Sequence, residues 1–121
     1  MNQHIIEKLK EIGEIIEQSR EHKESGDILA DDNIEISSLL YYLGELNEKI
    51  QTQWSNEFLE AKQTKNPKTG KPFTDKESEC MANIKVPERD YLRKKMEYAQ
   101  EFIKNTKVKI AVLQNQKQYS N

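Results

Sequence analysis

Residues 62–77 divide the chain and read K-Q-T-K-N-P-K-T-G-K-P-F-T-D-K-E. Pro67 lacks a backbone donor and disfavours helical geometry in the residue before it, so a helix should end just ahead of it. Gly70 can adopt the positive φ that a turn requires. Thr74 and Glu77 have the spacing of a capping box, which begins a helix. The stretch therefore predicts a turn between two helices.

The N-terminal segment has apolar residues at intervals of four and three, which mark one face of a helix. These residues are Ile5, Leu9, Ile12 and Ile16. They predict a helix over residues 3–24. Gly26 then interrupts the pattern, and Asp32 with Glu35 has the spacing of another capping box, so residues 25–32 are expected to form a hinge.

Longer apolar patterns flank the turn. The first predicts a helix over residues 33–64 from positions such as Ile36, Leu40, Leu43, Ile50, Trp54 and Phe58. The turn itself is placed at residues 65–73, and helical segments are expected over 74–85 and 87–116, with a break at Pro87. The predicted fold class is all-α: a short N-terminal helix plus a long antiparallel helical hairpin with coiled-coil-like packing, in one domain.

The last helical segment repeats apolar residues in alternating steps of four and three, as in the seam of a coiled coil. Six seam residues are Leu92, Met96, Ala99, Ile103, Ile110 and Leu113. A thin hairpin cannot bury two broad apolar faces alone, so these residues are assigned to a homo-oligomer interface. Four tyrosines are interpreted as core and interface packing: Tyr41, Tyr42, Tyr91 and Tyr98.

Charge is divided unevenly between the two halves. Residues 1–61 contain 5 Lys/Arg and 14 Asp/Glu, a net of −9, whereas residues 62–121 contain 14 and 7, a net of +7. This asymmetry indicates an anionic partner for the basic half, head-to-tail pairing of subunits, or mutual neutralisation within the fold.

The turn carries lysines without an acidic residue among them, followed by an aromatic ring. The predicted nucleic-acid-binding residues are Lys62, Lys65, Lys68, Lys71 and Phe73. Lysines can contact phosphates while an aromatic ring stacks on a base. The competing interpretation is a solvated lysine loop whose phenylalanine folds back on the hairpin.

Residue types suited to catalysis are few and scattered. His4 and His22 have no third ligand at metal spacing, and Cys80 has no neighbouring histidine, so it is expected to be a buried, inert thiol. We predict no enzyme activity, no cofactor and no metal. Charges within the first apolar run and the absence of a long apolar run predict a cytoplasmic protein without a membrane partner.

The layout from Gly26 to the C-terminus resembles the UvsY-type recombination mediators of T-even phages. The resemblance lies in a long helix with a Lys-bearing end, a short loop, and then a helix with a coiled-coil-prone tail. Lys62 and Lys65 fall where that family carries a basic cluster, although this chain has no arginine there and inserts N-P-K-T-G-K-P. The resemblance implies an oligomeric accessory protein that binds single-stranded DNA and a recombinase or other partner protein.

A different function is compatible with the same sequence. The first helix has an acidic face that includes Glu7, Glu11, Glu14 and Glu21. That face could bind a basic surface on another protein. The chain would then be a protein-only interaction module or inhibitor of the phage-encoded type.

Overall fold

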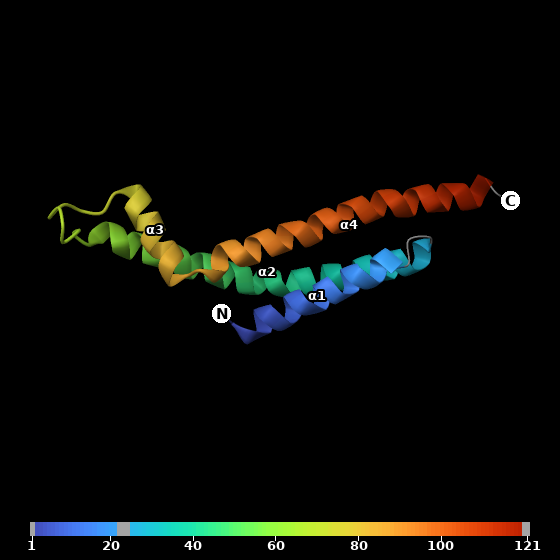
Figure 1. The fold of residues 1–121 in the computed structure, drawn as a ribbon, viewed down its shortest axis with the longest axis horizontal. Coiled ribbons are helices and arrows are strands. Elements are labelled where there is room, and N and C mark those ends of the chain that lie inside the picture. The colour runs from blue at the N-terminus through green and yellow to red at the C-terminus, as the bar shows by residue number, and fades with distance from the viewer. Residues whose placement is uncertain (1, 22–24, 120–121) are drawn as a thin grey trace.

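The computed structural model describes residues 2–21 and 25–119, which form four helices. The helices are α1 (Gln3–Glu21), α2 (Gly26–Gln63), α3 (Asp75–Lys85) and α4 (Glu88–Tyr119). α2 has 38 residues and is about 57 Å long. α1 and α4 lie along α2, and α3 packs near its far end (Figure 1). The all-α prediction is confirmed, and the last helix extends three residues beyond the predicted limit at residue 116.

The contacts between α2 and the later helices run in reverse chain order. The start of α2, at Gly26, lies against Leu113 near the end of α4. Asn33 Nδ2 donates a hydrogen bond to the Ile103 carbonyl at 3.4 Å. Farther along α2, the side chain of Gln51 accepts from Arg89 in the first turn of α4. α2 and α4 therefore run in opposite directions along their contact.

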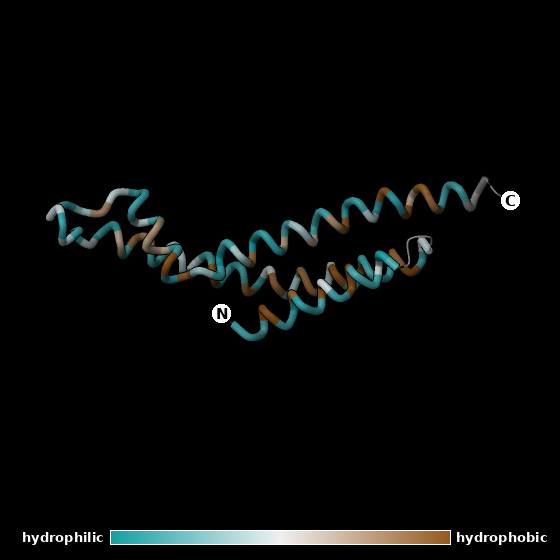
Figure 2. The backbone as a smooth tube through the Cα atoms, viewed as in Figure 1, coloured by the Kyte–Doolittle hydropathy of each residue, from teal (hydrophilic) through white to brown (hydrophobic). Residues whose placement is uncertain are grey.

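One apolar core joins α1, α2 and α4. Hydrophobic residues recur at intervals along each long helix (Figure 2). Among them, the side chains of Ile5, Ile36, Leu43 and Leu92 are completely buried. Burying a side chain of this size contributes about 1.5–3 kcal/mol. The predicted stripe of the first helix is confirmed, because Ile5, Ile12 and Ile16 are buried and Leu9 is half-buried.

The predicted hinge at residues 25–32 is wrong, because α2 begins at Gly26. Ser25 is the N-cap, and its side chain accepts a hydrogen bond from the Ile28 amide at 3.4 Å. Asp32 is inside the helix and accepts a hydrogen bond from Ser19 Oγ at 2.5 Å. Burial of the apolar residues on this segment, such as Leu29, offsets the local helix-breaking signal. The end of the predicted first helix, residues 22–24, lies outside the described residues.

The break at Pro87 is confirmed. α3 ends at Lys85, and the following Val86 is its C-cap, with its amide donating to the Ala82 carbonyl. α4 begins at Glu88, directly after the proline. The chain changes direction here, so α3 leaves the line of α4 and reaches toward the end of α2 (Figure 1).

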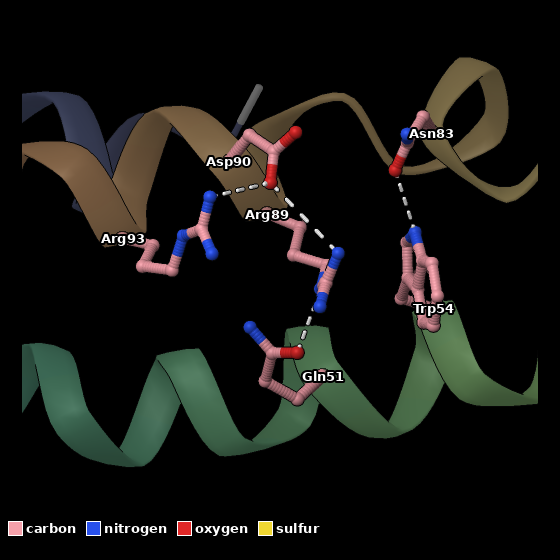
Figure 3. Close-up of polar contacts among 6 residues, drawn as sticks. All are labelled: Gln51, Trp54, Asn83, Arg89, Asp90 and Arg93. Carbon is pink, nitrogen blue, oxygen red and sulfur yellow. Dashed lines mark hydrogen bonds and ion pairs between the residues drawn. The ribbon is translucent and has the colours of Figure 1, made fainter. Parts of the chain in front are cut away.

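A polar junction fixes the position of α3 against α2 and α4 (Figure 3). The indole Nε1 of Trp54 donates to Asn83 Oδ1 at 2.8 Å, which joins α2 to α3. Arg89 lies with its guanidinium carbon 4.0 Å from the centre of the Trp54 ring, and its Nε donates to Gln51 Oε1 at 2.8 Å. A cation over an indole face is favourable, and the two hydrogen bonds fix its geometry. The junction therefore determines where the loop before α3 lies.

α3 presents small residues to α2 and its larger apolar residues elsewhere. Ser78 and Ala82 are fully buried, whereas Ile84 is 78% exposed. Cys80 is also exposed, so the prediction of a buried thiol is wrong. Because Cys80 is two residues from both Ser78 and Ala82, it falls on the opposite side of the helix. The small buried pair lets α3 approach α2 closely.

Candidate nucleic-acid interface

The turn between α2 and α3, residues 64–74, is hereafter called the tip loop, and it has a defined backbone. The Asn66 amide donates to the Lys71 carbonyl at 2.8 Å, and the Asn66 carbonyl accepts from the Gly70 amide at 2.8 Å. Asn66 Oδ1 also accepts from the Lys68 amide at 2.9 Å. Gly70 has a φ of 69°, a conformation that favours glycine. These bonds hold the loop in one turn rather than leaving it as an unstructured linker.

The tip loop is also tied to the start of α3. Thr74 and Glu77 form the predicted capping box, with each side chain accepting from the other residue's amide. The second carboxylate oxygen of Glu77 accepts from Asn66 Nδ2 at 2.9 Å. One glutamate therefore stabilises both the helix start and the turn.

Three lysines of the tip loop have exposed side chains: Lys65, Lys68 and Lys71. Within the described part of the chain, no ion pair engages any of them. Lys62 differs, because it forms an ion pair with Asp75 and lies 5.9 Å from the centre of the Phe58 ring. The structure therefore presents three of the four predicted lysines to solvent and uses the fourth to connect α2 with α3.

Phe73 is half-buried, and its amide donates to the Thr64 carbonyl at 3.3 Å. Only part of its ring is available to a ligand. The positive charge is also confined to the tip, because acidic residues such as Asp75, Glu77 and Glu79 follow immediately at the start of α3. The arrangement suits contact with a narrow, flexible polyanion better than with a broad, flat one.

The α4 seam is used largely inside the monomer. Leu92 and Ala99 are buried, and Met96 and Ile103 pack against the same core. Ile110 and Leu113 are half-buried. Leu92 and Ala99 are therefore not free for the oligomer interface assigned to them, because α2 and α1 already cover much of this seam. Periodicity showed that a face is buried but not which neighbour covers it.

The interpretation of the tyrosines as core residues is also wrong. Tyr41 is 78% exposed, and Tyr42, Tyr91 and Tyr98 are exposed as well. On α4, the two tyrosines and the lysines between them line a hollow of about 350 Å³. Lys95 Nζ is 5.7 Å from the centre of the Tyr91 ring.

We call this second surface the Tyr–Lys patch and define it as Tyr91, Lys94, Lys95 and Tyr98. Arg20 of α1 reaches its edge, where Nη2 donates to the Tyr98 hydroxyl at 3.0 Å. The patch was not predicted from the sequence, although spacings of three, four and seven residues place all four side chains on one helix face. Exposed aromatic rings beside lysines are suited to stacking on nucleic-acid bases.

The possible metal ligands in the described part of the chain lie apart from one another. His4 is exposed at the start of α1, while His22 lies outside the described residues. Across residues 2–21 and 25–119, no group of three His, Cys, Asp or Glu side chains is placed to hold a metal ion. Among the same residues, no helix has both the length and the apolar character needed to cross a membrane.

Comparisons of the chain with protein-family models, curated proteins and solved structures gave no significant match.

We expect the connection between the tip loop and α3 to weaken in acid. The pKa of Glu77 is lowered, first because the Thr74 backbone donates to its carboxylate, and further by the side chains of Thr74 and Asn66. A folded-state pKa below the unfolded value gives stability that is present above the unfolded pKa and lost as pH falls through the folded pKa. Wild type should therefore lose more stability than Glu77→Gln when pH falls through and below the ordinary glutamate range, as measured by urea denaturation. Equal losses in the two proteins would contradict this role.

Proposed function

We propose that this protein is a non-catalytic, homo-oligomeric accessory protein that binds single-stranded nucleic acid through the tip loop and also binds a partner protein such as a recombinase. The observation that supports the proposal most directly is the ordered turn that holds Lys65, Lys68 and Lys71 in solvent without ionic partners among the described residues. A pre-formed turn lowers the entropy cost of placing these charges against phosphates.

Single-stranded nucleic acid fits this geometry for two reasons. A flexible strand can follow a small cluster of charges, and its unpaired bases can stack on aromatic rings. The half-buried ring of Phe73 lies in the tip loop, and the Tyr–Lys patch offers two more exposed rings on α4. Lysines at both places would release counterions on binding, so affinity should fall as salt rises.

Removing tip-loop lysines should reduce this salt dependence. Each neutralised phosphate of a single strand contributes about −0.7 to the slope of log affinity against log salt. The double substitution Lys68→Ala with Lys71→Ala should therefore flatten the slope by about 1.4. The measurement is a gel shift or anisotropy titration with labelled single-stranded and double-stranded oligonucleotides at several salt concentrations.

Matched controls distinguish a local contact from a change in net charge. Lys10 and Lys49 are exposed lysines on α1 and α2, away from the tip loop. Their joint replacement by alanine removes the same charge and should leave the slope unchanged. If wild type shows no salt-dependent binding to either oligonucleotide, the nucleic-acid proposal is wrong.

The protein-only module is the second candidate, and the exposed face of α1 favours it. Glu7, Glu11, Glu14 and Glu21 are all exposed. Such a surface could bind a basic partner. Under this alternative, Glu11→Lys with Glu14→Lys should abolish capture of the partner, while the tip-loop substitutions should have no effect on it.

A further inference from the structure

An open groove runs between α2 and α4, and no residue of α1 lines it. Its volume is about 510 Å³, and its lining includes Ile34, Ser37, Ser38, Tyr41, Lys107 and Ile110. Ile34 is 66% exposed and Tyr41 is 78% exposed, so two large side chains with little cover flank the groove. Both side chains are therefore available for contact with another molecule.

The shape of the groove suits another helix. Ser37 and Ser38 are small and exposed, and they lie between the larger Ile34 and Tyr41 along α2. Small side chains between large ones allow the ridges of one helix to enter the grooves of another. One further helix would therefore cover Ile34 and Tyr41 and extend the helix packing already built from α1, α2 and α4.

We propose that a second copy of this chain occupies the groove, with the two α2 helices crossing in an antiparallel direction at Ser37 and Ser38. The resulting dimer is symmetric, because each copy offers the same surface to the other. The inference rests on the proposed homo-oligomeric state and supplies a surface for it, but it does not depend on nucleic-acid binding.

The charges around the groove fit this two-fold arrangement. Glu45 and Glu48 are exposed and follow Tyr41 by four and seven residues, which places them on the same stripe of α2. Lys104 and Lys107 of α4 are exposed and three residues apart, and they lie beside the opposite end of the groove. Two glutamates therefore lie beyond the Tyr41 end of the groove and two lysines beside its other end, where Asp27 and Asp31 of α2 are also exposed.

An antiparallel two-fold brings Glu45 of one copy toward Lys107 of the other. Glu45 lies seven residues beyond Ser38, which is about 11 Å along the helix axis. Lys107 lies a similar distance on the other side of the crossing, because the neighbouring Ile103 contacts α2 at Asn33 and Leu113 contacts it at Gly26. A two-fold axis at the crossing places Glu45 of each copy opposite Lys107 of the other. The chain thus supplies its own complementary partner.

Sedimentation and light scattering test the proposal directly. Wild type should have twice the monomer mass at micromolar concentration. Ile34→Asp and Tyr41→Glu should each raise the dimer dissociation constant by about 30-fold or more, the size expected for a central anchor. Ile84→Asp is the matched control, because Ile84 is as exposed as Tyr41 but lies on α3. It should leave the dimer intact.

Charge reversal and cross-linking identify the surface. Glu45→Lys should weaken the dimer, and adding Lys107→Glu should restore it, because the pair meets again with exchanged signs. In a Cys80→Ser background, Ser38→Cys should form a disulfide-linked dimer under mild oxidation, whereas Ser55→Cys on the same helix should not. Rescue and selective cross-linking would both support the two-fold contact.

Two outcomes would overturn the inference. A monomeric wild type would do so, and a helix of a different protein would become the occupant to seek. A dimer that resists both groove substitutions and does not cross-link through Ser38→Cys would show that the copies meet elsewhere. Neither result affects the oligonucleotide titration, so a failure of this surface and a failure of the tip loop are separate observations.

Discussion

Leu43→Ala should lower the free energy of unfolding by about 2–5 kcal/mol. The Leu43 side chain is completely buried in the core shared by α1, α2 and α4. Truncation removes its contacts and leaves a cavity that rigid helices fill only in part. The change should appear as a lower denaturation midpoint in urea, followed by far-ultraviolet circular dichroism.

The effect should be a large part of the total stability, because small domains are stable by only about 5–15 kcal/mol. Leu59 provides a control on the same helix, since its side chain is 55% exposed. Leu59→Ala should change stability by about 0.5 kcal/mol or less. Similar losses for the two variants would mean that the core shared by α1, α2 and α4 does not stabilise the protein.

Local sequence signals predicted the tip loop and the break at Pro87 well. Each depends on the covalent properties of one or two residues, namely the missing donor of proline, the positive φ of Gly70 and the reciprocal bonds of Thr74 and Glu77. These properties act within a few residues and do not require knowledge of the tertiary fold.

The predicted hinge failed for the opposite reason. Gly26 and Asp32 carry signals for a break, yet burial of Leu29 and a hydrogen bond from Ser19 to Asp32 hold the segment in a helix. The hydrogen bond comes from α1, and Leu29 lies between α1 and α4, beside Ser19 and Phe102. Tertiary contacts of this kind outweigh weak local propensities.

The candidate sites also divide into those that local sequence reveals and those that depend on tertiary packing. The tip-loop lysines were found because a run of charge without acids is visible in the sequence. The Tyr–Lys patch and the α2–α4 groove were not found, because an exposed tyrosine and a buried one have the same sequence pattern. Exposure depends on how the helices pack: no residue of α1 lines the groove, whereas Arg20 of α1 contacts Tyr98 at the edge of the patch.

Trp54→Ala should release α3 and the tip loop from α2. The Trp54 ring stacks on Phe58 with centroids 5.5 Å apart and lies under the Arg89 guanidinium. It also donates a hydrogen bond to Asn83 (Figure 3). All of these contacts are lost on truncation, and because the ring is half-buried we expect a cost near the lower end for such a change, about 3 kcal/mol. Relative to wild type, the amide hydrogen exchange rate should increase more in α3 than in α1, since the junction lies at the α3 end of the molecule.

Trp54→Phe separates the hydrogen bond from the ring. Phenylalanine keeps an aromatic face for Arg89 and Phe58 but leaves Asn83 Oδ1 without its donor, at a cost of about 1 kcal/mol. This variant should remain folded. Its amide hydrogen exchange rate at residues 75–85 should increase less than in Trp54→Ala. Because those residues carry the cap that holds the tip loop, oligonucleotide affinity should fall in the order wild type, Trp54→Phe, Trp54→Ala. Unchanged exchange in α3 for both variants would show that the junction does not position the loop.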